Sequence, residues 1–334
     1  MSARYRILQP GDLDGLLNPS QAFGLEVLHG LSEHPKRLSS KFFYDDEGSR
    51  IFQQIMGLEE YYPTRCEYEI LENNRGDIGE HLRGEAFNLV ELGAGDGLKT
   101  NLLISRFLEK GMQFAYVPID ISAGAMNDLS ESLIKKFPNL TMAGIVAEYF
   151  EALKWLSSIT DKPSLILFLG SNLGNFSSSQ ARTFLRSLWN TLKEGDLVLI
   201  GFDLKKNIDV MLEAYNDRKG VTAAFNLNLL RRINRELGGN FSLDTFRFFA
   251  TYNVFSGAIE SYLVSKEEQD VYIEAVGQSF HFKAWEPIHT EYSYKYLISD
   301  IERLAAKTGF IIEKQYFDQK GYFVDSLWRV RKTG

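Results

Sequence analysis

The sequence has few of the residues that build covalent, metal-based or membrane-spanning structures. Its single cysteine, Cys66, excludes an internal disulfide and a cysteine-based metal site. Its five histidines lack metal-ligand spacing, so we expect no bound metal. No apolar run approaches the length of a membrane span, and no signal-peptide core follows Met1–Arg6. These absences predict a metal-free cytoplasmic protein that does not associate with membranes.

Basic residues are also in the minority. The 334 residues carry a formal net charge of −7, which argues against nucleic acid as a partner because phosphate binding needs a basic face. The length is generous for one compact domain and comfortable for two. We therefore expect a two-domain protein, a monomer, that acts on a small molecule.

A glycine-rich stretch at residues 87–100 organises the first half of the chain. An apolar run ends in Glu91, glycines follow at positions 93, 95 and 97, and a helical pattern begins near Thr100. Glycine tolerates positive φ and lets a ligand approach the backbone, while a helix N-terminus offers N–H groups to an anion. The pattern predicts a cofactor cradle, although a bare tight turn would look similar.

The spacing within this stretch bears on which cofactor it holds. It lacks the two-residue gap before the last glycine that the dinucleotide fingerprint uses for pyrophosphate. The next apolar run, 114–119, ends in Asp120, which is placed to accept both ribose hydroxyls of either cofactor. The pattern favours S-adenosylmethionine, and a nicotinamide-dependent oxidoreductase is the alternative.

Apolar strands and helical segments alternate through the middle of the chain. This rhythm predicts a Rossmann-like α/β fold with a parallel sheet. Two final strands close it in antiparallel fashion, as in class I S-adenosylmethionine-dependent methyltransferases. The predicted strands are 87–91, 114–120, 140–146, 164–169, 196–202, 310–317 and 322–330, and the predicted helices are 66–82, 100–110, 123–137, 150–158, 179–191 and 297–308.

The rhythm breaks between residues 205 and 296. Residues 205–240 read as helical and 244–283 as antiparallel strands, which predicts an inserted α+β substrate lobe. We expect residues 65–205 and 297–334 to form the cofactor-binding methyltransferase domain. The substrate-binding lobe would comprise 1–64, with short helical pieces in 1–40, and 206–296.

Loops at the carboxyl ends of the strands should hold the chemistry. The loop 170–176 places two asparagines between Gly170 and Gly174, where a methyl acceptor should meet the sulfonium. Glu148 and Tyr149 follow the third strand. They fit adenine recognition, and they equally fit a helix N-terminal acid followed by a core aromatic.

Two stretches outside this domain are candidates for substrate binding. Tyr61 and Tyr62 precede Pro63, which predicts an extended or turn geometry for Tyr62; the pair could be a pocket wall or a packed aromatic turn.

In residues 288–296, strand alternation predicts that four polar side chains project to one side. They are His289, Glu291, Ser293 and Lys295. Glu291 and Ser293 could bind a polar heterocycle, or the segment could be a solvated edge strand.

Together these stretches resemble the histidine Nα-methyltransferases of ergothioneine biosynthesis, which convert L-histidine to its trimethylated betaine, hercynine. The resemblance runs from about Lys41 to the end of the chain. The order and combination of the motifs are more specific than the glycine loop. They are Phe43-Tyr44-Asp45, Glu60 to Arg65, Glu91 to Gly95 with Lys99-Thr100, Gly170-Ser171 with Gly174-Asn175-Phe176, Gly220 to Asn226, Asn234 to Gly238, and His289-Thr290-Glu291 with Ser293.

The resemblance implies S-adenosylmethionine as methyl donor, S-adenosylhomocysteine as product, and no metal. Lys99 would pair with the methionine carboxylate. The implied cofactor residues are Gly93, Gly95, Lys99, Asp120, Glu148, Tyr149 and Gly170.

The resemblance also implies the residues that bind the amino-acid substrate. Tyr61, Asn175 and Tyr215 would hold its α-carboxylate and amine, and Tyr44 would face the amine; Tyr44 and Asn175 are the implied catalytic residues. The imidazole would be bound by Glu291 and Ser293, with Thr222 helping through water.

One departure from the family pattern bears on the choice of substrate. Ser261 stands where the family has a methionine near the imidazole, and a smaller, polar residue enlarges or wets the pocket. A related amino acid, such as a tryptophan derivative, is therefore the alternative substrate. A non-catalytic ligand-binding protein is a further alternative.

Overall fold

The computed structural model describes residues 7–8, 19–82, 84 and 86–332. The chain divides into two compact units, each assembled from segments that are distant in sequence. Unit 1 comprises Met1–Asp14, Pro63–Lys205 and Lys295–Gly334. Unit 2 comprises Gly15–Tyr62 and Lys206–Tyr294.

Unit 1 is built on a mostly parallel sheet with the strand order β1-β4-β3-β2-β5-β6-β13-β12. Its neighbours from β1 to β6 pair in parallel, and β13 is antiparallel to both β6 and β12. The α/β sheet predicted from the sequence, with an antiparallel closing strand, is confirmed. The strands are β1 (Ile7–Leu8), β2 (Phe87–Leu92), β3 (Phe114–Asp120), β4 (Gly144–Val146), β5 (Ser164–Phe168), β6 (Leu197–Asp203), β12 (Phe310–Phe317) and β13 (Phe323–Val330).

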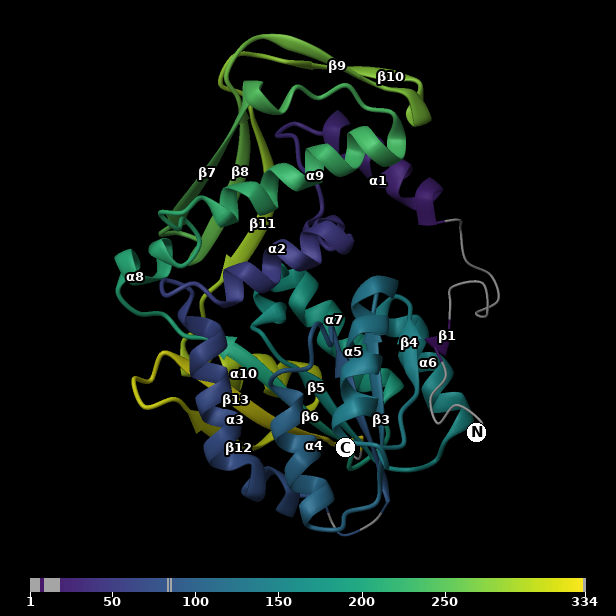
Figure 1. Ribbon diagram of the computed structural model, residues 1–334. Helices are drawn as coiled ribbons and strands as arrows, with labels where there is room; N and C mark the ends of the chain where they lie inside the picture. The colour runs from purple at the N-terminus through teal and green to yellow at the C-terminus, as the bar shows by residue number, and fades with distance from the viewer. Residues whose placement is uncertain (1–6, 9–18, 83, 85, 333–334) are drawn as a thin grey trace. The chain divides into compact units, whose positions relative to one another are not determined.

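Helices pack on this sheet because its central strands are apolar on both faces. Residues of α6, α7 and α10 share one buried cluster with strand residues such as Ile166, Val198 and Trp328. Figure 1 shows α3 and α4 in front of the strands. The helices of unit 1 are α3 (Tyr62–Glu80), α4 (Thr100–Glu109), α5 (Ala123–Lys136), α6 (Tyr149–Ile159), α7 (Ser178–Thr191) and α10 (Ile298–Thr308), with the 3-10 turn η3 (Asn172–Asn175).

Two predictions for the N-terminal part of the chain were wrong. Ile7–Leu8, expected within short helical pieces, is a strand that pairs with Gly144 and Ile145 at the sheet edge. Tyr62, expected to have an extended or turn geometry, is the first residue of α3. Pro63 is tolerated there because N–H groups in the first helical turn have no intrahelical partner. The expected pieces at 1–6 and 9–18 lie outside the described residues.

Unit 2 combines helices with two small antiparallel sheets, of order β11-β8-β7 and β10-β9. The long helix α9 contacts α2 and β7, and α2 lies beside it in Figure 1. The elements are α1 (Pro19–Ser32), η2 (Ser40–Phe43), α2 (Asp46–Met56), α8 (Ile208–Glu213), α9 (Val221–Leu237), η4 (Leu243–Thr245), β7 (Phe246–Asn253), β8 (Ala258–Ser265), β9 (Gln269–Ile273), η5 (Glu274–Val276), β10 (Gln278–Phe282) and β11 (Pro287–Tyr294).

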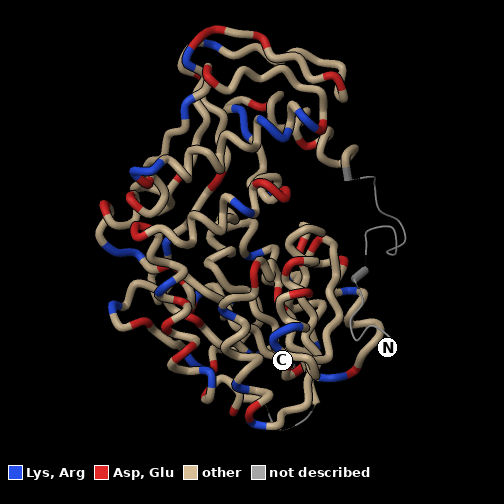
Figure 2. Tube along the Cα trace, viewed as in Figure 1, with Lys and Arg blue, Asp and Glu red and all other residues tan. Residues whose placement is uncertain are grey.

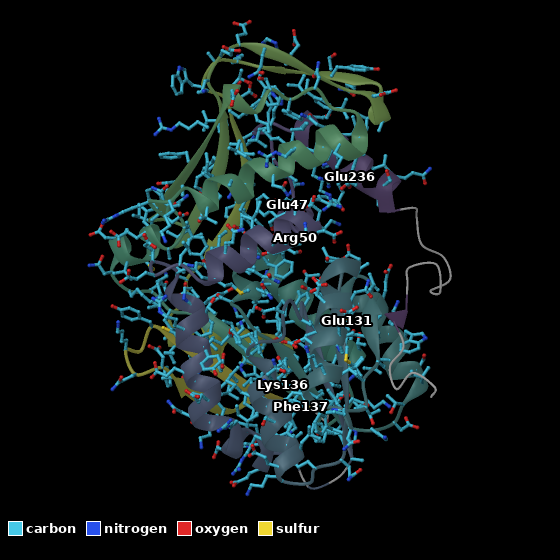
Figure 3. The ribbon with its side chains drawn as sticks, in the orientation of Figure 1. Glu47, Arg50, Glu131, Lys136, Phe137 and Glu236 are labelled. Carbon is cyan, nitrogen blue, oxygen red and sulfur yellow. The ribbon has the colours of Figure 1, made fainter. Side chains whose placement is uncertain are left out.

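Helix α2 shows how a short amphipathic segment is fixed in unit 2. Asp45 caps its N-terminus by accepting from the Gly48 N–H at 2.8 Å. Ile51 and Ile55 are buried, whereas Glu47 and Arg50 are exposed to solvent (Figure 3). Lys and Arg are interspersed with Asp and Glu along the described chain of each unit (Figure 2), as on an ordinary solvated surface.

Candidate functional site

The glycine loop of unit 1 has the backbone that its spacing predicted. Gly93, Gly95 and Gly97 have φ angles of +74°, +52° and +66°, a region that glycine adopts without strain. A Cβ atom on Gly93 would lie 2.9 Å from the hydroxyl of Tyr149. The loop between β2 and α4 therefore has both the conformation and the close neighbours that only glycine permits.

Asp120 lies at the end of β3, where its carboxylate reaches the glycine loop. It accepts hydrogen bonds from the N–H groups of Gly95 at 3.2 Å and Ser122 at 2.9 Å. Burial raises the pKa of Asp120, and these backbone donors oppose the shift. The structure thus brings Asp120 to the loop as the sequence predicted.

Glu91, at the other side of the same loop, has a structural role that the sequence did not reveal. Its buried carboxylate accepts from the hydroxyls of Thr100, at 2.5 Å, and Tyr116. Burial raises its pKa to about 7. These bonds tie the start of α4 to β2 and β3 and so hold both ends of the loop.

Glu148 and Tyr149 mark the start of α6. The Tyr149 ring lies edge-on to Phe168 and Phe184, with centroid distances of 5.9 and 6.4 Å. Glu148 is exposed. The packing of the Tyr149 ring fits the core-aromatic alternative, while its hydroxyl borders Gly93 of the glycine loop.

The loop after β5 has an uncommon backbone. Gly170 has a φ of +76° and Ser171 a φ of 56°, and a left-handed non-glycine residue is a recurrent feature of functional sites. The buried Ser171 hydroxyl accepts from the N–H of Asp203 at 3.2 Å, which holds the turn. Asn175 ends η3 in the same loop and is half-buried.

Lys99 lies between the two loops, and its ammonium forms an ion pair with Glu67 of α3. Glu67 is fully buried and also accepts from the Gly170 N–H at 2.7 and 2.9 Å. We did not predict Glu67. The available signal was an acid on the apolar face of a helix, one turn before Ile70 and Leu71. We call Gly93, Gly95, Lys99, Asp120, Tyr149 and Gly170 the glycine-loop cluster.

In unit 2, the predicted substrate residues form a chain of contacts. The Ser293 hydroxyl donates to the Tyr215 hydroxyl at 2.7 Å. The Tyr215 ring lies 5.9 Å from that of Tyr61, and Phe52 links Tyr61 to Tyr44 with centroid distances of 6.2 and 5.5 Å. We call Tyr44, Tyr61, Tyr215, Ser261, Glu291 and Ser293 the tyrosine–serine cluster.

A β-bulge in β11 sets the direction of the two polar residues in this cluster. Glu291 pairs with Ser261 across β8, and the register shifts between His289 and Glu291. His289 instead pairs with Tyr262 and lies 4.0 Å from the Tyr292 ring. The extra residue of a bulge reverses the alternation of side chains, so His289 and Glu291 project from opposite faces.

The predicted polar row was therefore wrong for two of its four members. The first of the two is His289, on the opposite face from Glu291. The second is Lys295, which lies beyond the end of β11 and forms a buried ion pair with Asp203 at 2.9 Å within unit 1. The alternative of a solvated edge strand does not fit either, because Ser293 is buried. On the outer edge of β11, the backbone of His289 is hydrogen-bonded to Lys36 and Leu38.

Helix α9 holds the bulge through a buried polar pair. The Thr290 hydroxyl lies 2.8 Å from Asn226 Oδ1 and 3.0 Å from the carbonyl oxygen of Ser261. The Asn226 amide donates to the carbonyl of Thr222 at 3.1 Å. Asp217 caps the helix by accepting from the Thr222 N–H at 2.8 Å. Thr222, predicted to bind substrate through water, thus lies buried at the start of α9.

The two clusters offer different chemistry. The glycine-loop cluster provides backbone N–H groups, a carboxylate and an ammonium, which suit a zwitterionic adenosyl compound. The tyrosine–serine cluster provides a carboxylate, hydroxyls and aromatic faces, which suit an N–H heterocycle and a cation.

Neither a metal site nor a membrane span is found in the part of the chain that the structure describes. No group of His, Cys, Asp and Glu among those residues is arranged to hold a metal ion. None of the described helices combines the length and apolarity needed to cross a bilayer.

Comparisons with known proteins address the choice of cofactor that the glycine spacing left open. Residues 23–330 match the family described as histidine-specific, S-adenosylmethionine-dependent methyltransferase. A histidine N-alpha-methyltransferase of Mycolicibacterium smegmatis is 34% identical, over 92% of this chain and 95% of that protein.

Two further relatives have bacterial and fungal origins. A histidine N-alpha-methyltransferase of Mycobacterium tuberculosis is 34% identical, over 90% of this chain and 93% of its own length. A 4-dimethylallyltryptophan N-methyltransferase of Claviceps fusiformis is 29% identical, over 83% of each chain. With a match across nearly the whole chain, this protein belongs to the family of histidine-specific, S-adenosylmethionine-dependent methyltransferases.

Proposed function

We propose that this protein transfers methyl groups from S-adenosylmethionine to the α-amine of L-histidine and yields Nα,Nα,Nα-trimethylhistidine. Unit 1 would bind the methyl donor and unit 2 would bind the amino acid. The bacterial relatives named as histidine N-alpha-methyltransferases support the choice of substrate.

The observation that carries the choice of histidine is the cross-strand placement of Glu291. The bulge puts this carboxylate opposite Ser261, with Ser293 buried two residues further along β11. An imidazole has one N–H donor and one acceptor nitrogen when neutral, and two donors when charged. A carboxylate next to serine hydroxyls can satisfy both ring nitrogens in either state.

We propose that the tyrosines of the same cluster hold the other end of the amino acid. Tyr61 and Tyr215 would bind the α-carboxylate and amine, and Tyr44 would face the amine. The substrate-binding role expected of Asn175, which belongs to unit 1, stays a prediction. Their rings also suit the product, because a quaternary ammonium is attracted to the negative face of an aromatic ring.

Donor binding is assigned to the glycine-loop cluster. Asp120 would accept from the ribose hydroxyls, Lys99 would pair with the methionine carboxylate, and Glu148 with Tyr149 would flank the adenine. The positive φ angles of Gly93, Gly95 and Gly170 support this assignment, since they leave backbone exposed where a side chain would otherwise stand.

Methyl transfer from a sulfonium to an amine is an in-line displacement, which needs alignment, an unprotonated nucleophile and exclusion of water. The tyrosines of unit 2 would align the amine. Proton removal needs no strong base, because the amine can release its proton to solvent, either through a bound water or by relay through the Tyr44 hydroxyl, which would accept one proton and pass on its own. The reaction requires no metal.

The test is a direct assay of the purified protein with S-adenosylmethionine and each amino acid in turn. We expect methylated histidine by mass spectrometry. Absence of turnover with every amino acid, alongside tight binding of S-adenosylhomocysteine and histidine, would favour the non-catalytic alternative.

A tryptophan derivative is the second candidate substrate. It is favoured by the small side chain of Ser261 opposite Glu291 and by the relative named for 4-dimethylallyltryptophan. Turnover of tryptophan compounds with no turnover of histidine would establish it. A cytoplasmic location and a monomeric state, both expected from the sequence, remain predictions.

A further inference from the structure

The carboxylate of Glu67 is fully buried in unit 1 and contacts two different parts of the glycine-loop cluster. It forms the ion pair with Lys99, at the start of α4, and accepts from the N–H of Gly170, in the loop after β5. The two partners are also close to each other, because a Cβ atom on Gly170 would lie 3.5 Å from Lys99 Nζ. One carboxylate thus fixes the separation of two loops.

The sheet beneath Glu67 is shaped to admit it. A Cβ atom on Gly201 of β6 would lie 2.2 Å from Glu67 Oε1, so any larger residue there would displace the carboxylate. On the adjacent strand β13, Asp325 pairs with Gly201 and is also fully buried. The Glu67 side chain of α3 is thus packed against β6 and β13, which fixes its position more closely than an ion pair on the surface would.

Glu67 is the charged partner of Lys99 in this buried group, which also contains Asp325. Burial and the charge of Glu67 raise the pKa of Asp325 well above its usual value, which favours its neutral form. Burial alone would lower the pKa of Lys99, but the Glu67 carboxylate raises it above its ordinary value. Lys99 therefore stays charged, with Glu67 as its buried counter-ion.

We propose that Glu67 is a positioning residue for methyl-donor binding: by pairing with Lys99 and accepting from the Gly170 N–H, it holds the Lys99 ammonium and the loop at Gly170 in the arrangement in which Lys99 receives the methionine carboxylate. This inference rests on the proposed function, in which Lys99 pairs with that carboxylate. Glu67 would not touch the donor itself, because its oxygens are already taken up by Lys99 and Gly170.

The test compares two ligands that differ only where Glu67 should matter. S-adenosylhomocysteine carries the amino-acid end, and 5′-methylthioadenosine lacks it. For Glu67→Gln we expect S-adenosylhomocysteine to bind about tenfold weaker by calorimetry, since a misplaced charged hydrogen bond costs about 1.5 kcal/mol. Binding of 5′-methylthioadenosine should stay within about twofold of wild type.

If the role of Glu67 is purely structural, Glu67→Gln should weaken the binding of both ligands equally or of neither, and either result overturns the proposal. Asp196→Asn is the matched control: this buried acid lies at the far end of β6 and accepts from the N–H groups of Ser164 and Lys193. It should change neither ligand's affinity. If Glu67→Gln does not fold, Glu67→Asp can be used, because it keeps the charge but moves it away from Lys99 and Gly170. It should weaken the binding of S-adenosylhomocysteine by a smaller factor and leave that of 5′-methylthioadenosine unchanged.

A double-mutant cycle tests whether Glu67 acts through Lys99. Lys99→Met should show the same ligand split, and the double variant should be no weaker than Lys99→Met alone. Additive losses would contradict the proposal. Failure of the wild-type protein to bind either ligand would instead contradict the proposed function, and so the two failures are distinguishable.

Discussion

The two units place their candidate groups by different physical means. Unit 1 uses backbone conformation and buried charge: glycines with positive φ, the Glu67–Lys99 pair, and Glu91 beneath the glycine loop. Unit 2 uses individual side chains, with tyrosine rings in edge contact and with serine hydroxyls and the Glu291 carboxylate on strands. A site built from backbone conformation and buried ions suits one ligand that does not change. A site built from side chains on a strand can change its ligand through single substitutions.

This difference matches the two ligands that the family uses, a constant methyl donor and a variable methyl acceptor. The donor is the same in every relative that uses S-adenosylmethionine, so fixed backbone and buried ions suffice for it. The acceptor differs, as the names of the mycobacterial and Claviceps relatives show. Substitutions confined to one unit should therefore affect the binding of one ligand and spare that of the other.

The largest effect concerns the buried charge of unit 1. Because the folded-state pKa of Glu91 is raised to about 7, its contribution to stability is fully present below its unfolded pKa and is lost as the pH rises to 7. Relative to Glu91→Gln, the wild type should lose about 3 kcal/mol of unfolding free energy between pH 4.5 and 7.5.

Urea unfolding of both proteins at several pH values measures this difference. The glutamine variant is isosteric with the protonated acid, so the two proteins should be similarly stable near pH 4.5. A constant difference across the pH range would mean that the pKa of Glu91 is not raised in the folded state.

The next effect should be confined to unit 2. Glu291→Ala removes the proposed partner of the imidazole, and a lost charged hydrogen bond of about 2.5 kcal/mol should raise the KM for histidine by about 70-fold. The dissociation constant of S-adenosylhomocysteine should not change. Unchanged histidine kinetics would remove Glu291 from the substrate site.

Asp120→Ala should give the converse result in unit 1. Loss of the ribose contact should weaken S-adenosylhomocysteine by about 30-fold, or about 2 kcal/mol. Histidine binding, measured by calorimetry, should be retained. Donor affinity equal to that of wild type would refute the ribose role of Asp120.

The smallest effect tests the bulge itself. Thr290→Val keeps the shape of the side chain but removes the hydroxyl that contacts Asn226, so the direction of Glu291 should be less well fixed. We expect histidine to bind about fivefold weaker, the equivalent of about 1 kcal/mol. Thr290→Ser, which keeps the hydroxyl, is the control and should bind as wild type does.

The sequence predicted the features that local patterns encode. Glycines at 93, 95 and 97 and an acid at the end of the next strand are local signals, and the structure brings them together at one loop. The parallel sheet followed from the alternation of apolar strands and helices. These features depend on backbone geometry and short-range order, which spacing along the chain can express.

The features that escaped prediction depend on tertiary contacts. Glu67 and Lys99 are 32 residues apart, and nothing in their local sequence links them. The bulge at Thr290 was missed because strict alternation was assumed, and its stabilising partner, Asn226, lies on a helix far away in sequence. Pro63 was interpreted as a sign of extended or turn backbone at Tyr62, although proline is equally suited to the first turn of a helix.

The most direct test of histidine Nα-methylation is the identity of the product that the purified protein forms from L-histidine and S-adenosylmethionine. Mass spectrometry with fragmentation should show histidine carrying three methyl groups on its α-nitrogen and none on its ring. Methylation of a tryptophan compound but not of histidine, or methylation of the imidazole nitrogens, would contradict the assignment of Glu291 and Ser293 to imidazole binding.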